Sequence, residues 1–386
     1  MKISQVYDIL NKTTQEVLGK TDLVINEDLS NIVDVGTAVL NTDDLDKYTG
    51  SLVDHVGRVV FVDRAYSGSA PSVLMDGWDY GAVMEKISMA ELPKATENES
   101  WNLVDGQSYD PNVFYQPKVE TKFYDKGVTF EVPMSFTDVQ LKTAFSSAEQ
   151  MNGFLSMIYS WIDKSLTIKL DNLIMRTICS FAGDLVYSEY SDSNYTAKSG
   201  VRAVNLLKLY NDKYETTLTQ AEALTNPAFI RFASYTMGLY QDRLTRMSSL
   251  FNVGGRDRFT APDMLHAVLL SDFAKAADAY LQSDTYHNSY TALPKADIVP
   301  YWQGTGTGYN FTDISKISVK TGSGNDVTLD GIIGIFFDHD ALGVTCQNRR
   351  IKTQPNQKAE FTNYWYKVDS RYFNDLNENG IVFFIK

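Results

Sequence analysis

The fold is decided by residues 119–181, which read VETKFYDKGVTFEVPMSFTDVQLKTAFSSAEQMNGFLSMIYSWIDKSLTIKLDNLIMRTICSF. In the first part of this stretch, apolar and polar side chains alternate on either side of an Asp-Lys-Gly turn. Alternation of this kind predicts two half-buried strands, here residues 119–124 and 127–132, joined as a hairpin. Pro133 is expected to end the second strand because proline cannot donate to a strand ladder.

The second part of the stretch predicts helices. Ser135–Phe145 has the pattern of one short helix, and Ser146 with Glu149 forms a capping box that opens a second. From Met151 onward apolar residues recur at helical spacing until Gly183, a residue type that commonly ends helices. The pattern therefore predicts one exceptionally long helix, ending near Ala182, that serves as a spine for the fold.

Composition limits the class of protein. The chain has 386 residues, of which 44% are hydrophobic and 12% aromatic, so it is long enough for two or three globular domains and too apolar to be disordered. No apolar run approaches a membrane span, and the N-terminus lacks the apolar core of a signal peptide. The net charge of −13 argues against a broad basic surface that grips nucleic acid, although it does not exclude enclosing nucleic acid.

Residues outside the decisive stretch predict an α+β protein. Residues 3–18 and 29–40 have weak helical patterns, and residues 57–124 mix short strands with turn-rich segments. Helical patterns return at residues 201–214, 226–251 and 261–281. Four apolar segments then predict strands. Residues 317–320 and 327–329 are joined by a Gly-Ser-Gly-Asn turn, and the other two are the continuous run 332–337 and the final run 381–385.

The sequence contains no recognisable catalytic or metal-binding motif. Its four histidines have no metal-ligand spacing, and Asp338-His339-Asp340 is better explained as a turn. The glycine-rich segment 304–308 lacks the lysine of a phosphate loop. The two cysteines, Cys179 and Cys346, are interpreted as small buried hydrophobes. We therefore predict no catalytic, cofactor-binding or metal-binding residues, and a protein that is not an enzyme.

Six arginines leave two interpretations open. They could form a basic patch that touches phosphate or a neighbouring subunit, or they could be solvated or paired within the chain. The residues are Arg243, Arg246, Arg256, Arg258, Arg349 and Arg350.

The order of these elements resembles the major capsid proteins of tailed bacteriophages, with the Hong-Kong-ninety-seven-type fold. The resemblance covers most of the chain and is carried by residues 127–133, 141–145, 337–344, 361–369 and 377–384. It implies an N-terminal arm, an extension loop built on a β-hairpin, a peripheral domain with the spine helix, an axial domain, and a return to the peripheral sheet. Their expected ranges are residues 1–56, 57–127, 128–182, 183–329 and 330–386.

The resemblance implies a function without bond-making chemistry. The chain is expected to self-assemble as pentamers and hexamers into an icosahedral phage head, in the host bacterial cytoplasm, around double-stranded DNA that is enclosed without sequence-specific binding. A separate scaffolding protein and a portal are the expected partners, with no membrane. The alternatives are the shell of a cellular nanocompartment or, from another class, a soluble enzyme or carbohydrate-binding protein.

Four aromatic residues are candidates for contact between subunits, because aromatic side chains dominate interface energetics. Each of them is equally compatible with a place in a local core. They are Trp78, Tyr80, Trp101 and Tyr109.

Overall fold

The computed structural model describes residues 71, 73–75, 84–137, 148–282, 295–303, 308 and 310–386. The chain divides into two compact units, of which the larger comprises Gly68–Phe130, Thr167–Arg350 and Lys367–Lys386. The described part of the smaller unit comes from Glu131–Leu166 and Ile351–Tyr366. The predicted N-terminal arm lies outside the described residues.

A five-stranded sheet forms the centre of the larger unit, in the order β5-β13-β10-β6-β7. Strand β10 pairs antiparallel with both β13 and β6, whereas the outer pairs β13–β5 and β6–β7 are parallel. The strands are β5 (Ala203–Asn205), β6 (Leu265–Leu270), β7 (Asp297–Val299), β10 (Ile332–Asp338) and β13 (Gly380–Phe384). Every residue of β10 and β13 is buried, which confirms the two apolar runs as buried strands.

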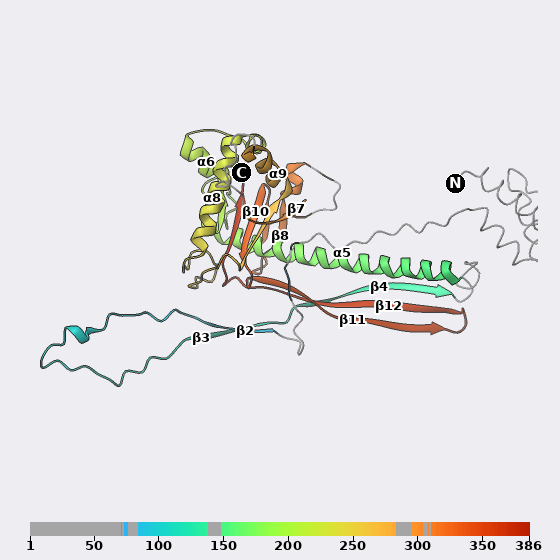
Figure 1. Cartoon of the computed structure of the whole chain (residues 1–386), viewed down its shortest axis with the longest axis horizontal. Helices are drawn as coiled ribbons and strands as arrows, with labels where there is room; N and C mark the ends of the chain where they lie inside the picture. Colours follow the sequence, from blue (N-terminus) through green and yellow to red (C-terminus); the bar gives the residue numbers. More distant parts are fainter. Residues whose placement is uncertain are drawn as a thin grey trace, which may run out of the picture. The chain divides into compact units, whose positions relative to one another are not determined.

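Strands β10 and β13 are almost entirely apolar because both faces of the sheet are covered. On one face Phe336 joins a core with α6 (Leu206–Tyr214), α8 (Pro227–Leu244) and α9 (Ser271–Gln282), the three helices grouped around the sheet in Figure 1. On the other face Phe337 packs edge-on against Phe181 of the long helix α5, with ring centroids 6.3 Å apart.

Helix α5 runs from Ala148 to Glu189, so the prediction of one long helix is confirmed but its predicted end at Gly183 is wrong. Toward its C-terminus the helix is buried on almost every side, which stabilises it beyond the glycine. Gly183 instead provides space for a neighbour, because a Cβ atom there would lie 2.4 Å from Cγ2 of Val319. No helix in the described part of the chain is both long and apolar enough to cross a membrane.

The neighbour at Gly183 belongs to a confirmed hairpin. Strands β8 (Ile317–Lys320) and β9 (Asp326–Leu329) pair antiparallel around the predicted Gly-Ser-Gly-Asn turn. Gly324 in this turn has a φ of +86°, a conformation that favours glycine. The short helices are α7 (Gln220–Ala223), α10 (Phe311–Ile314) and the 3₁₀ helix η1 (Glu99–Trp101).

Two segments predicted as helical contain strands. Residues 203–205 form β5 ahead of α6, and residues 265–270 form β6 ahead of α9. A short, fully buried apolar run has no periodicity that separates strand from helix, so its neighbours in the sheet decide. Helix boundaries follow local chemistry instead: the Asn226 side chain accepts hydrogen bonds from the first turn of α8, and Pro227 occupies the first helical position.

The hairpin predicted for residues 119–132 is wrong, because its two strands pair with other strands and not with each other. Strand β3 (Val119–Tyr124) pairs with β2 (Met84–Met89), whereas β4 (Gly127–Thr137) joins a four-stranded sheet. The order of that sheet is β1-β11-β12-β4, with β1 (Leu74–Met75), β11 (Leu342–Asn356) and β12 (Phe361–Asn374).

Strand β4 also continues through Pro133, contrary to prediction. It is the last strand in the order of the described sheet, the type of position in which proline is tolerated. Thr137 ends the strand, and the remainder of the predicted helix Ser135–Phe145 lies outside the described residues.

Candidate assembly surface

The two-stranded ribbon of β2 and β3 has two chemically different faces. Its residues alternate between more and less exposed positions on both strands. The exposed residues, here called the outer face, are mostly apolar and comprise Glu85, Ile87, Met89, Val119, Thr121 and Phe123. Ile87 and Phe123 are 64% and 66% exposed, respectively. The less exposed residues, the inner face, are Met84, Lys86, Ser88, Glu120, Lys122 and Tyr124.

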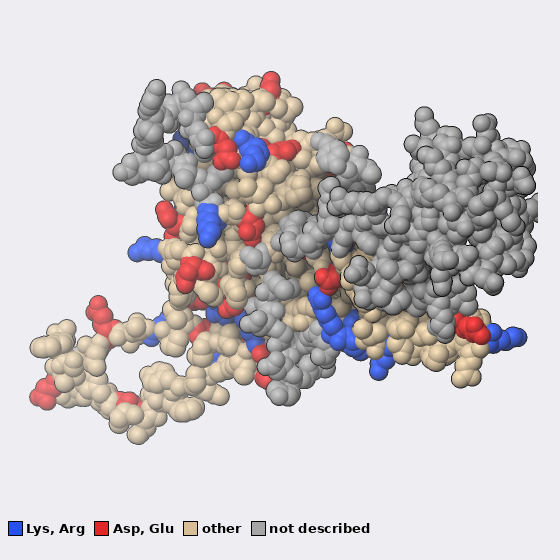
Figure 2. Space-filling model, turned by 45° about the vertical axis from the view of Figure 1, so that its right-hand side comes forward, with Lys and Arg blue, Asp and Glu red and all other residues tan. Residues whose placement is uncertain are grey.

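Residues 90–118, here called the tip loop, connect the two strands and extend the exposed surface. Trp101 is 94% exposed, and Phe114 and Tyr115 are each 84% exposed. Figure 2 shows the tip loop at the lower left as an open protrusion with separate acidic side chains. Monomeric proteins rarely expose apolar surface so continuously, so this surface has the character of an interaction site.

The structure shows the surroundings of two of the four predicted contact residues. Trp101 and Tyr109 both lie on the exposed surface of the tip loop, so neither belongs to a local core. The Tyr109 hydroxyl is hydrogen-bonded to the amide of Val104 and to the side chain of Gln107, both at 3.3 Å, which are contacts within the loop. Trp78 and Tyr80 lie outside the described residues. A contact with another subunit stays a prediction for all four.

Ion pairs that the sequence pattern did not predict attach the inner face of the ribbon to residues near the C-terminus. Lys86 and Lys122 stand directly opposite each other in the ribbon. Lys86 Nζ lies 2.8 Å from Asp375 Oδ2, and Lys122 Nζ lies 3.0 Å from Asp375 Oδ1. Glu378 joins this Asp375 cluster, at 2.8 Å from Lys86 and 3.3 Å from Arg258. No spacing in the sequence indicates the cluster, because its acidic and basic members are more than 100 residues apart.

The ion pairs of the cluster lower the pKa of Asp375 and raise the pKa of Lys86. Burial alone would raise the pKa of Asp375, but hydrogen bonds and charge from Lys86, together with the Asn377 amide and Lys122, outweigh it and lower the pKa. Burial alone would lower the pKa of Lys86, but Asp375 and Glu378 outweigh it and raise the pKa. Both groups are therefore held in their charged forms.

A defined pH window follows for the Asp375 cluster. A lowered carboxyl pKa gives stability that is present above the unfolded value of 3.8 and is lost as pH falls through the folded value. A raised lysine pKa gives stability that is present below the unfolded value of 10.5 and is lost as pH rises through the folded value. We therefore expect the difference in urea midpoint between the native chain and Asp375→Asn to be constant from about pH 5 to 9 and to shrink as pH falls below the unfolded value of 3.8.

Glu91→Gln is the control for this pH series, because Glu91 forms its 2.9 Å ion pair with Lys118 at an exposed position. Its urea midpoint should stay close to that of the native chain across the series, since exposed ion pairs contribute little. A gap between the native chain and Asp375→Asn that does not shrink as pH falls below 3.8 would contradict the assignment.

Two of the predicted arginines fix the ribbon from within the chain. Arg256 lies 2.6 Å from Glu120 Oε2 and donates at 2.8 Å to the carbonyl oxygen of Ala90. Arg258 belongs to the Asp375 cluster. Pairing within the chain is therefore the correct interpretation for these two residues, and Arg350 likewise pairs with Asp369.

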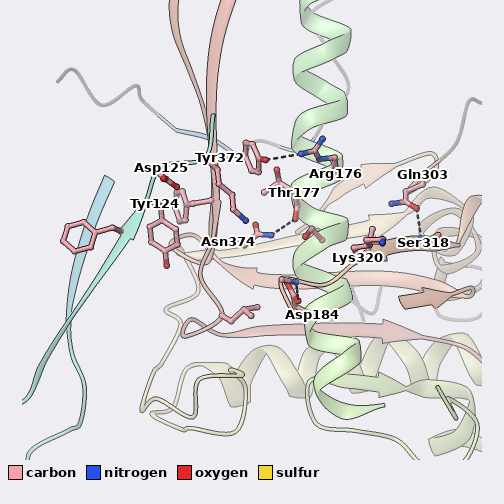
Figure 3. Close-up of a pocket in the computed structure, with 17 residues that line it drawn as sticks. Tyr124, Asp125, Arg176, Thr177, Asp184, Gln303, Ser318, Lys320, Tyr372 and Asn374 are labelled. Atoms are coloured by element: carbon pink, nitrogen blue, oxygen red, sulfur yellow. Dashed lines mark hydrogen bonds between the residues drawn. The ribbon is translucent and has the colours of Figure 1, made fainter. Parts of the chain in front are cut away.

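A cleft of about 670 Å³ lies between the C-terminal end of β3 and α5, and residues of β8 and β12 also line it (Figure 3). Arg176 donates to the Tyr372 hydroxyl at 3.1 Å, and Asp184 accepts from the Gly322 amide at 2.8 Å. Burial raises the pKa of Asp184. None of the described residues that line the cleft is a histidine or a cysteine, so this lining offers no thiol nucleophile and no imidazole base.

The other candidate chemistry has structural explanations. Asp338 accepts hydrogen bonds from Thr260 Oγ1 at 2.6 Å and from the Asp340 amide at 3.0 Å, so the Asp-His-Asp segment is a turn as predicted. The described residues contain no group of three or more side chains that could hold a metal ion. Cys179 is buried, and this burial raises the pKa of its thiol to about 12. Most of the segment 304–308 lies outside the described residues.

The chain is similar in sequence to phage capsid proteins. The family model for Phi29-like phage major capsid proteins matches residues 10–384. The major capsid protein of Bacillus phage GA-1 is 24% identical over 169 residues, a match that covers 43% of this chain and 34% of that protein. The matched region thus spans about a third of the length of that relative.

A solved phage structure shares the fold. A chain from the structure of the head fiber and inner core protein gp22 of native bacteriophage P68 aligns with a TM-score of 0.50 at 12% identity, over 85% of this chain and 87% of that one. A chain from the capsid structure of Staphylococcus phage Andhra aligns with a TM-score of 0.49 at 11% identity, with the same two coverages. Since the family model matches almost the entire sequence, this chain belongs to the Phi29-like phage major capsid protein family.

Proposed function

We propose that copies of this chain assemble, as pentamers and hexamers, into the icosahedral head of a phage. The observation that supports this most directly is the apolar outer face with its tip loop, which remains exposed on a single copy. A two-stranded ribbon is marginally stable by itself, so both the ribbon and its exposed side chains gain stability from a neighbour. In the proposal, the outer face and tip loop of each copy lie on an adjacent copy, with Trp101 and Tyr109 among the contacts.

The segments of the chain have separate roles in this proposal. Residues 1–56 act as an N-terminal arm and residues 57–127 as the extension loop, which contains the β2–β3 ribbon. Residues 128–182 and 330–386 make up a peripheral domain, and residues 183–329 an axial domain. Packing between copies, and not bond-making chemistry, is the function.

We also propose double-stranded DNA, a scaffolding protein and a portal as partners of the head. The head would enclose double-stranded DNA without sequence-specific binding, in agreement with a net charge of −13. Assembly would take place in the host bacterial cytoplasm with a separate scaffolding protein and a portal. Membership of a phage capsid family favours this function over a nanocompartment shell or an enzyme.

Negative-stain electron microscopy of the purified chain, alone and with a co-expressed scaffolding protein, tests the proposal. Closed shells, or rings of five and six, are expected when the scaffolding protein is present. A dispersed monomer under every condition would overturn the capsid function. Uniform closed shells from the chain alone would instead contradict only the requirement for scaffolding.

A further inference from the structure

We propose that Asp375 is the positioning residue of the β2–β3 ribbon, because its two carboxylate oxygens hold one lysine from each strand. This inference deepens the proposed function, on which it rests for its relevance to assembly. The contact itself lies within the larger unit of a single copy, so it can be measured without a shell.

Contacts along the inner face change from aromatic to ionic along the ribbon. We call the end at which Met84 pairs with Tyr124 the base of the ribbon. At the base, the rings of Tyr124 and Phe373 lie 5.2 Å apart. Two residues further along β3, Lys122 and its partner Lys86 reach Asp375. Another two residues along, Glu120 reaches Arg256. The aromatic contact therefore acts as a pivot, and the ionic contacts beyond it set the direction of the ribbon.

The Asp375 carboxylate is positioned by its own turn as well as by the ribbon. The Asp375 amide donates to the Ala341 carbonyl oxygen at 2.6 Å, and the Asn377 amide donates to Asp375 Oδ1 at 3.1 Å. The Asp375 side chain is only 3% exposed, so solvent screens its charge weakly. The carboxylate is therefore held by backbone contacts outside the ribbon as well as by the two lysines.

The geometry assigns one oxygen to each strand. Oδ2 faces Lys86 of β2, and Oδ1 faces Lys122 of β3. Loss of the carboxylate charge would leave these two lysines directly opposite each other in the ribbon, where like charges repel. An amide at position 375 could accept through one oxygen only and would present an NH₂ group to the other lysine. Asp375→Asn should therefore convert an attraction into a repulsion.

Other polar and charged groups also surround the Asp375 carboxylate. Glu378 shares Lys86 with Asp375, and Arg258 partly neutralises Glu378. Tyr124 of β3 faces the same cluster, and burial together with the nearby Asp375 charge raises its pKa, so its hydroxyl is neutral. The Asp340 carbonyl oxygen accepts from Lys86 at 3.1 Å. Asp375 is thus the only carboxylate in the cluster that contacts both strands of the ribbon.

Hydrogen exchange read by mass spectrometry on the dispersed full-length chain tests the assignment. For Asp375→Asn we expect amides of β2 and β3 to exchange about tenfold faster, as on loss of one hydrogen bond to a charged group, while β10 and β13 keep the native rates.

Two further variants keep the test decisive. Glu91→Gln removes the exposed ion pair with Lys118, at the start and end of the tip loop next to the ribbon, and should leave exchange in β2 and β3 unchanged. Lys86→Met combined with Lys122→Met removes the attraction without disturbing the turn at Asp375, so the ribbon amides should again exchange faster than in the native chain. Native exchange rates in the ribbon of either cluster variant would overturn the proposal. Failure of the outer face to mediate assembly would appear in shell yield and not in these rates.

Discussion

A chain that carries Ile87→Asp and Phe123→Asp is expected to fold normally and to fail to form shells. Both side chains lie on the outer face and are largely exposed in a single copy, so neither stabilises the core of the larger unit. In a contact with a neighbour, each aspartate would have to enter an apolar interface without a partner charge. Central interface residues commonly contribute about 2 kcal/mol or more, so two such losses per copy should reduce shell yield at least about a hundredfold.

Sedimentation and negative-stain microscopy, with the scaffolding protein present, would measure that yield. Ile87→Leu combined with Phe123→Leu is the matched control, because it keeps the outer face apolar and should keep most of the yield. The urea midpoints of all three chains should agree closely. Normal shells from the aspartate variant would exclude the outer face as an assembly surface, whereas a lowered urea midpoint would indicate a folding defect.

The second large effect is expected in the core, for Gly380→Ala. Gly380 begins β13, and a Cβ atom there would lie 2.5 Å from Cε1 of Phe181 and 2.9 Å from Cδ1 of Leu185. Both side chains are fully buried, so they have no space into which to move. Overpacking of this kind should lower the free energy of unfolding by about 1–3 kcal/mol, measured by urea denaturation.

Gly238→Ala provides the control of opposite sign. Gly238 lies inside α8, and a Cβ atom there would have no neighbour within 4 Å. Alanine in an open helical position should raise the free energy of unfolding by about 0.5–1 kcal/mol. If both substitutions had the same small effect, the close packing of β13 against α5 would be contradicted.

Elements with strong periodicity or continuous apolar character could be predicted from the sequence. The buried strands β10 and β13, the β8–β9 hairpin and most of helix α5 are confirmed, and so are the α+β fold and the capsid family. In each of these elements, the pattern of apolar side chains within one segment is enough to predict which of its residues are buried. The order of these elements along the chain carried the resemblance to the family.

Strand partners could not be predicted from local patterns. Residues 119–124 and 127–132 satisfy every local rule for a hairpin, but β3 pairs with β2 and β4 lies beside β12. Gly183 illustrates the same limit, because its role depends on Val319, far away in the sequence. The Asp375 cluster likewise depends on distant segments, and single lysines in an alternating strand give no sign of a buried partner.

The two faces of the ribbon also differ in the thermodynamic signature that their contacts should carry. Burial of the apolar outer face against a neighbour should be accompanied by a large decrease in heat capacity, whereas the ionic inner face contributes little to that quantity. Cooling weakens contacts of the first kind. Association between copies should therefore become less favourable in the cold, while each copy keeps its ribbon in the same direction.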